Sequence, residues 1–470
     1  MKALRVVSHH AEKAFLAFVL LAVVLGGSGR AAFANLFLQL AAIALIAIAA
    51  WRLRGIVPTR ALRWSFLLLA AIIALPLVQL IRLDPDIWRL MPDRGWIAEG
   101  FAQLDVDAPW LGISLTPGAT LAAWFHLLPP VAAFLFALTL DPRGQRRALG
   151  VLLVAAMISL ALGTLQFAAA SPSLHFHAIS NVGSATGFFA NRNHLATLLL
   201  MAMPASATLI ATWRVDRKGD AIPQRRRWLL AGPLLLLLFS GLLMTGSRAG
   251  FGLGIAAMLL SLLIVRRGSG GGLPVSLALV AAVTCVAVIV LAYVSGLGTR
   301  AVAEAASLST DELRIVAAPI TAELGWRYFP FGSGFGSFET MFKSAGGAVN
   351  LGQYYVNHAH NDYLELWLEA GAAGIVVIVG FLILWLGTTR LHWRAPPGDA
   401  ATLGKAASMA VGLVLLHSVV DFPLRTLGAA VPFAMMCAFA LAASVGVATP
   451  ARHARGELRI HVRNATPQRA

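Results

Sequence analysis

The chain has 470 residues, of which 58% are hydrophobic and 12% are charged, and its mean hydropathy is +0.76. Because a water-soluble globule of this length does not need so much apolar material to fill its core, the composition excludes that class and indicates an integral membrane protein. The net charge is +16, but the arginines are dispersed over short connections instead of forming one basic face, which argues against a nucleic-acid partner.

Long apolar runs follow one another along almost the whole chain. About 20 apolar residues in a helix cross a hydrocarbon core roughly 30 Å thick. We therefore predict an all-α integral membrane protein with about 12 transmembrane helices. Both cysteines, Cys285 and Cys437, fall inside such runs, so we expect neither a disulfide nor a thiolate metal site. The predicted spans are 14–29, 31–51, 64–83, 119–140, 148–168, 188–212, 228–246, 250–265, 273–295, 371–389, 405–420 and 427–447.

Charges in the connections orient these helices. If both termini are cytoplasmic, the cytoplasmic segments hold 26 of the 37 lysines and arginines, as the positive-inside rule requires. Two long segments, 84–118 and 296–370, then lie on the outer side, and the tryptophans of the first suit a membrane interface. The predicted organisation is a bundle of nine helices over 1–295, a large periplasmic loop with short helices over 296–370, three helices over 371–447 and a cytoplasmic tail over 448–470.

The large outer loop contains two recognisable patterns. Ser309 to Glu323 predicts a short helix that Pro319 ends or kinks. Residues 329–338, with the sequence FPFGSGFGSF, carry three glycines whose spacing does not fit a dinucleotide-binding turn. We expect this segment to form a flexible loop beneath a functional site.

The stretch from Asn357 to Gly374 places polar side chains immediately before a long apolar run. Ionisable groups at a bilayer boundary indicate a functional site, because they contribute nothing to membrane insertion. Asp362 and Glu365 have the spacing of a capping box, which predicts that a helix begins here with His360 at its mouth. The free N–H groups and the dipole of that helix would favour an anion such as phosphate.

Further polar residues recur at predicted helix boundaries on the outer side. His417, Asp421 and Arg425 are spaced at i, i+4 and i+8, which places them on one helical face, although Pro423 disturbs that geometry. With Arg192 and His194 they could bind a glycan or pair with one another, and we favour pairing.

The sequence that begins at His360 resembles the O-antigen ligase and O-antigen polymerase family. His360 and Asn361, followed by nine residues and then Gly371, match the family signature of histidine, then Asn, Ser or Gln, nine residues and glycine. The resemblance extends over about 185–430. Its other segments are 187–194, 246–250, Arg314 with Trp326, Pro330 and 332–334, and 417–423.

The resemblance implies a multi-pass glycosyltransferase of the bacterial inner membrane that acts at the periplasmic face without a metal or cofactor. It would take a glycan from an undecaprenyl-diphosphate donor and pass it to an acceptor hydroxyl. Three acceptors stay open: a lipid A core sugar, the end of another repeat unit, or a protein Ser/Thr hydroxyl. A ligase or polymerase of lipopolysaccharide or polysaccharide biosynthesis is favoured over a protein O-oligosaccharyltransferase.

His360 is the predicted catalytic base, because imidazole is the side chain that exchanges protons most readily near neutral pH. By position, Arg248 and Arg314 match the family's two phosphate-handling arginines, and a guanidinium group binds phosphate with two parallel donors. Arg248 could instead anchor a helix at the interface, and Arg300 or Arg327 could replace Arg314. The predicted supporting residues are His358, Asn361, Glu365, Arg192, Arg327 and Asp421.

A polytopic transporter or flippase for a polysaccharide precursor is the alternative from another functional class, since secondary carriers also contain about twelve helices. Carriers place charges inside their spans. Here the predicted spans are almost free of charge and the polar groups collect at one face, which favours the enzyme.

Overall fold

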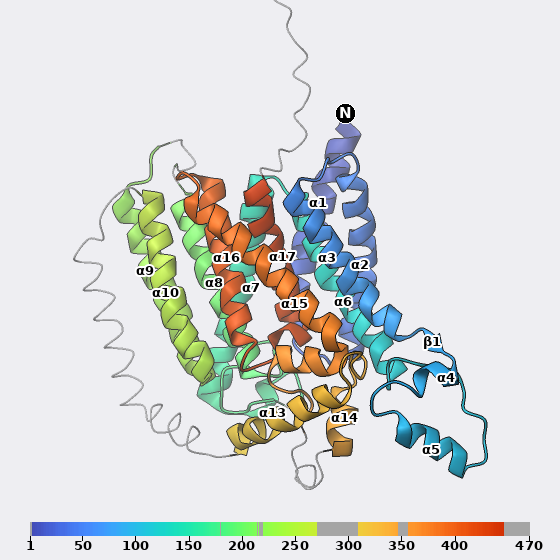
Figure 1. Cartoon of the computed structure of the whole chain (residues 1–470). Helices are drawn as coiled ribbons and strands as arrows, with labels where there is room; N and C mark the ends of the chain where they lie inside the picture. The colour runs from blue at the N-terminus through green and yellow to red at the C-terminus, as the bar shows by residue number, and fades with distance from the viewer. Residues whose placement is uncertain are drawn as a thin grey trace, which may run out of the picture.

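The computed structural model describes residues 2–178, 180–213, 215, 220–269, 309–345 and 356–445. The described chain is mostly α-helical and forms one bundle of long helices, with shorter helices across one end (Figure 1). The predicted span 273–295 with Cys285, the alternative phosphate ligand Arg300 and the tail 448–470 lie outside the described residues.

The long helices follow the predicted apolar runs. They are α1 (Lys2–Leu25), α2 (Ala32–Leu53), α3 (Arg60–Gln79), α6 (Pro117–Ala137), α7 (Pro142–Ala169), α8 (Arg192–Ala211), α9 (Gln224–Thr245), α10 (Arg248–Ser269), α15 (Asp362–Arg394), α16 (Asp399–His417) and α17 (Leu427–Val445).

Nine helices in the described part of the chain are long and apolar enough to cross a membrane, namely α2, α3, α6 to α10, α15 and α16. Each coincides with a predicted span. The predicted spans 14–29 and 427–447 fall in α1 and α17, which are not among these nine, although α17 contains a shorter apolar helix, Leu427–Ala443. The helical membrane fold is therefore confirmed, whereas the number twelve is not.

Helix α8 lies at the centre of the bundle, and 94% of its apolar window is buried. Its sequence is apolar all round, which is the pattern of a helix surrounded by protein. The hydroxyl groups of Ser206 and Thr208 donate to the carbonyl oxygens of Met203 and Pro204, at 2.7 and 2.9 Å, so these polar atoms are satisfied within the helix. Helices α3 and α15 lie at the periphery, with only 17% of their windows buried.

One end of the bundle gathers the starts of α8, α10 and α15 and the end of α16, and it is called the His360 end here. Helices α13 (Ser309–Arg327) and α14 (Phe338–Ala345) lie across this end (Figure 1). Pro319 lies inside α13, which continues past the predicted end at Glu323 to Arg327. A salt bridge of 3.3 Å joins Glu339 of α14 to Arg30 in the connection between α1 and α2.

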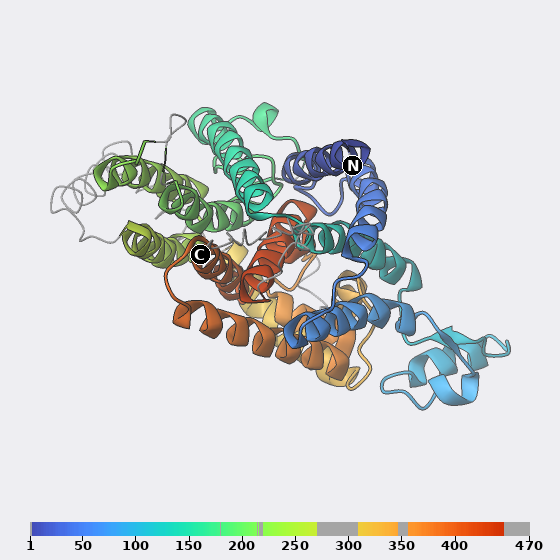
Figure 2. The ribbon, with the colours of Figure 1, turned by 90° about the horizontal axis from the view of Figure 1, so that it is seen from above.

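The segment after α3 forms a small unit of its own. Strand β1 (Arg82–Leu83) pairs antiparallel with β2 (Leu111–Gly112), and α4 (Pro85–Trp88) and α5 (Gly95–Gln103) lie between them in the chain. The unit projects from the edge of the bundle (Figure 2). Trp88 is buried and donates to the carbonyl oxygen of Pro109, so it stabilises this unit, whereas Trp96 and Trp110 are more than half exposed.

The glycine-rich segment 329–338 is tightly packed. The backbone N–H groups of Ser333 and Gly334 donate to the carbonyl oxygens of Leu368 and Glu369, at 2.9 and 3.0 Å. Gly332 has a φ of +77°, and a Cβ there would collide with the backbone of Glu369. The expectation of a flexible loop was therefore wrong: these glycines permit close backbone approach to α15 instead of mobility.

Candidate active site

His360 lies immediately before α15, in the turn that opens the helix. Its φ of +50° is in the left-handed region, where a non-glycine residue persists only when its surroundings hold it. The next residue, Asn361, caps α15 by accepting from the N–H groups of Tyr363 and Leu364, at 2.9 and 3.0 Å. This turn and cap fix the imidazole at the mouth of the helix, where it is one quarter exposed.

Two details of the predicted helix start were wrong. The cap is Asn361, not Asp362, whose side chain instead accepts from the Ser418 hydroxyl at 2.8 Å. The first N–H groups of α15 are already bonded, since Asp362 N–H donates to the Ser418 carbonyl at 3.0 Å and Asn361 takes the next two. Two acidic residues also lie in the first turn. The helix mouth therefore does not favour an anion.

Asp421 holds the imidazole of His360. Its Oδ1 accepts from Nδ1 of His360 at 3.1 Å, and its Oδ2 lies 3.6 Å from Nε2 of His194 in α8. Asp421 is fully buried in the connection after α16. Burial by itself would raise the pKa of Asp421, but the hydrogen bond from His360 and the neighbouring His194 hold the pKa well below its usual range. Asp421 is therefore ionised.

An ionised carboxylate can only accept hydrogen bonds, so Nδ1 of the neutral His360 ring carries the proton. The lone pair then resides on Nε2, the nitrogen directed away from Asp421. This is the arrangement that a general base needs, because the carboxylate fixes both the tautomer and the orientation of the ring.

His358 forms a second histidine–carboxylate pair. Its Nδ1 lies 2.8 Å from Oε1 of Glu365, whose other oxygen accepts from the N–H of Ala359 at 2.9 Å. His358 is about one quarter exposed and Glu365 is buried. Glu365 therefore connects the first turn of α15 to the loop that carries both histidines.

Arg425 binds the carboxylates of the first two turns of α15. It lies in a short 3-10 helix, η3 (Pro423–Arg425), and its guanidinium is 2.8 Å from Glu369, 3.5 Å from Glu365 and 3.7 Å from Asp362. Burial alone would lower the pKa of Arg425, but the three carboxylates raise it. The free oxygen of Glu369 accepts from the N–H of Gly336 at 2.8 Å. One arginine thus joins α15 to the connection between α16 and α17.

The predicted helical face of His417, Asp421 and Arg425 does not exist, because α16 ends at His417. Pairing within the predicted set is seen between Asp421 and His194, at 3.6 Å. The other contacts are made to residues outside the set: His417 with Thr197 of α8, at 2.8 Å between Nδ1 and Oγ1, Asp421 with His360, and Arg425 with the carboxylates of α15.

Phe422 lies at the centre of three imidazoles, and sequence reasoning missed it. Its ring centroid is 4.4 Å from that of His358, 4.8 Å from that of His360 and 5.1 Å from that of His194. The last two rings meet it nearly edge to face, which is a favourable aromatic geometry. An apolar residue has no chemical signature in a sequence, and its only signal was its place directly after Asp421.

The predicted arginines take different positions. Arg248 begins α10 at the His360 end, two residues before Gly250, which packs closely against Ala196 of α8. Arg192 begins α8, and its guanidinium donates to Ser184 at 3.3 Å. Arg327 forms an exposed pair with Glu323 at 2.8 Å on α13. Arg314 falls within α13, but its side chain is outside the part of the chain that the structure describes.

Part of the chain is similar to a known protein family. Residues 233–379 match the family described as O-antigen ligase. The matched range includes α9 from Pro233 onward, α10, α13, α14 and the first half of α15, and with them His358, His360 and Glu365. No curated protein matches the chain. The resemblance found in the sequence is therefore confirmed over residues 233–379 of this multi-pass membrane protein, which match the O-antigen ligase family.

Proposed function

We propose that the protein transfers a glycan from undecaprenyl diphosphate to an acceptor hydroxyl at the periplasmic face of the bacterial inner membrane. The observation that carries this proposal is the pair His360–Asp421, at 3.1 Å between Nδ1 and Oδ1 and at one end of a membrane bundle. His360 lies within the residues matched to the O-antigen ligase family, and Asp421 lies beyond them. The family match indicates the class of enzyme, and His360, oriented by Asp421, provides the general base.

The reaction requires one proton acceptor and one site for negative charge. Nε2 of His360 takes the proton of the acceptor hydroxyl while the hydroxyl oxygen attacks the anomeric carbon of the glycan. The bond between that carbon and the diphosphate oxygen breaks, and the electron pair leaves with the diphosphate. A positioned base of this kind contributes about 10²- to 10⁴-fold to the rate.

The leaving diphosphate needs cations at the His360 end of the bundle. Arg425 is unsuitable, because its guanidinium contacts three carboxylates of α15. Arg248 is exposed at the His360 end and Arg192 lies beside it on α8, against Gly246. We assign the diphosphate to Arg248 and Arg314, with Arg192 in support. A guanidinium–phosphate contact at 4 Å amounts to about 4 kcal/mol at an effective dielectric constant near 20, before desolvation is subtracted.

Glycosyltransferases of this class differ in the acceptor that receives the glycan. We favour a ligase or polymerase, in which a sugar hydroxyl is the acceptor, over transfer to a protein hydroxyl. In a deletion strain, full-length lipid-linked chains would accumulate if the protein is a ligase, and single repeat units would accumulate if it is a polymerase.

The direct test is glycan transfer by the purified protein in nanodiscs, with a lipid-diphosphate-linked glycan as donor. His360→Ala should reduce transfer by about 10²-fold or more, since the base is lost. His10→Ala, an exposed histidine of α1, is the matched control and should transfer normally. Full activity of His360→Ala would refute the assignment. Movement of the donor across liposomes by His360→Ala at the wild-type rate, without any transfer, would favour a transporter.

A further inference from the structure

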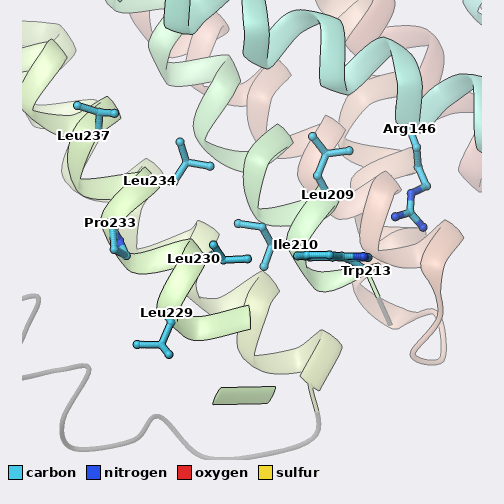
Figure 3. Close-up of a pocket in the computed structure, with 9 residues that line it drawn as sticks. All are labelled: Arg146, Leu209, Ile210, Trp213, Leu229, Leu230, Pro233, Leu234 and Leu237. Atoms are coloured by element: carbon cyan, nitrogen blue, oxygen red, sulfur yellow. The ribbon is translucent and has the colours of Figure 1, made fainter. Parts of the chain in front are cut away.

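A recess of about 600 Å³ opens between α7, α8 and α9 (Figure 3). It lies at the end of the bundle opposite to His360, because α8 begins at the His360 end with Arg192 and the recess adjoins its last residues. Its walls are almost entirely apolar. They are Leu209 and Ile210 of α8, Trp213, Leu229, Leu230, Pro233, Leu234 and Leu237 of α9, and Arg146 of α7.

The apolar wall belongs to the outward face of α9. The opposite face buries Trp228, Ala231 and Leu235 against the bundle, whereas Leu229 and Leu237 in the recess are 59% and 45% exposed. From Leu229 to Leu237 the wall is about 12 Å long, at 1.5 Å per residue. Within a bilayer, an apolar recess of this kind is filled by hydrocarbon, because polar groups or water would lose their hydrogen bonds there.

One end of the recess is cationic. Arg146 of α7 projects toward Trp213 (Figure 3), and its Nη1 donates to the carbonyl oxygen of Thr212 at 3.1 Å. Arg226, in the first turn of α9, stacks over the Trp213 ring at 5.7 Å. Two guanidinium groups therefore lie beside the indole ring of Trp213, and tryptophan is enriched at membrane interfaces. The connection between α8 and α9 is also predominantly basic, with Arg214, Arg217 and Lys218 against Asp216 and Asp220 before the run Arg225, Arg226 and Arg227.

We propose that this recess binds an anionic membrane phospholipid. The phosphate lies between Arg146 and Arg226, the glycerol region lies beside Trp213, and an acyl chain runs along the leucines of α9. Charge complementarity selects this occupant: hydrocarbon fills the apolar wall, and the two guanidinium groups at its end require a negative headgroup. The lipid would join α7, α8 and α9 at the end of the bundle where no part of the proposed reaction takes place.

Native mass spectrometry of the full-length protein tests the proposal with phosphatidylglycerol, phosphatidylcholine and inorganic phosphate as separate probes. Phosphatidylglycerol should bind at least about tenfold more tightly than phosphatidylcholine, because each arginine near the membrane surface favours an anionic lipid. The double variant Arg146→Gln/Arg226→Gln should lose this preference. The control Arg143→Gln/Arg225→Gln removes the same charge from exposed neighbours outside the recess and should retain it.

A second variant separates the apolar part of the site from its charges. Leu230→Trp fills the recess and should weaken phosphatidylglycerol binding, whereas Leu259→Trp, on the exposed face of α10, should not. Equal binding of both phospholipids, unchanged binding in Arg146→Gln/Arg226→Gln, or saturation by inorganic phosphate alone would overturn the proposal. These experiments measure phospholipid binding and not glycan transfer, so a negative result would leave the proposed reaction unaffected.

Discussion

Nδ1 of His360 lies 3.1 Å from Oδ1 of Asp421, although 61 residues separate them in the chain. The contact joins the turn before α15 to the connection after α16. It also fixes the tautomer of His360, with the proton on Nδ1. Asp421 does not reach the reacting atoms itself, so it is a positioning residue whose effect passes through the imidazole.

Asp421→Asn should therefore reduce the transfer rate strongly while leaving donor binding intact. The asparagine amide can donate to Nδ1 and so favour the tautomer in which Nε2 carries the proton, which removes the base. We expect kcat to fall by about 10²-fold or more, with KM changed by less than about threefold. Steady-state transfer assays would measure both, with exposed Asp107→Asn as control. An unchanged kcat would contradict the positioning role.

Arg248→Lys should be nearly as damaging as removal of the side chain. Lysine keeps the charge but loses the two parallel donors that fit a phosphate group, so leaving-group stabilisation falls. A decrease of about tenfold or more in kcat/KM is expected, measured with the lipid-diphosphate donor. Arg60→Lys, at the start of α3 and the other end of the bundle, should have no effect. Equal activity of the two variants would show that Arg248 only anchors α10.

Phe422→Leu should impair catalysis more than it impairs folding. Leucine keeps most of the apolar volume but gives up the ring contacts to His194, His358 and His360, so the imidazoles lose their orientation. We expect about a tenfold loss in kcat, since small misplacements of catalytic groups are costly. Phe439→Leu, at a fully buried position in α17, creates a similar cavity away from the site. Comparable activity losses in both variants would mean that Phe422 only fills space.

Arg425→Met should destabilise the protein severely. Asp362, Glu365 and Glu369 would lose their shared cation, and the last two are fully buried. Breaking a buried ion pair in this way costs about 3–5 kcal/mol. Thermal unfolding in detergent would measure the loss. Arg327→Gln provides the comparison, because its exposed pair with Glu323 contributes about 1 kcal/mol or less. Similar unfolding temperatures for the two variants would contradict the structural role of Arg425.

The salt bridge between Arg30 and Glu339 predicts a specific dependence on pH. Partial burial by itself would raise the pKa of Glu339, but Lys343 and Arg30 lower it overall. A carboxylate whose pKa is lower in the folded than in the unfolded protein stabilises the folded state at pH values above its unfolded pKa. This stabilisation is lost as the pH falls through the folded pKa. Wild type should thus exceed Glu339→Gln in unfolding temperature at pH 7. The difference should shrink as the pH falls below the ordinary carboxyl pKa and disappear once the pH is below the lowered one. A difference that grows in acid would contradict this assignment.

Local patterns were sufficient to predict several features of this protein. A run of about 20 apolar residues must form a helix in lipid, because each backbone N–H and C=O group needs a partner within the same segment. The nine spans in the described chain therefore follow directly from their sequences. The position of His360 before a helix was also predictable, since polar side chains with a capping pattern precede an apolar run at Asn361.

Contacts between distant segments could not be predicted in this way. Asp362 appeared to be a helix cap, but Ser418 and Arg425 bind its carboxylate, so Asn361 caps α15 instead. The role of Phe422 among three histidines and the contact of Arg425 with three carboxylates depend on how the connection between α16 and α17 packs against the start of α15 and the loop before it. Periodicity and residue type describe one segment at a time. Tertiary packing determines the partner of a buried charge, because the charge loses its water and requires a counter-charge only when the segments come together.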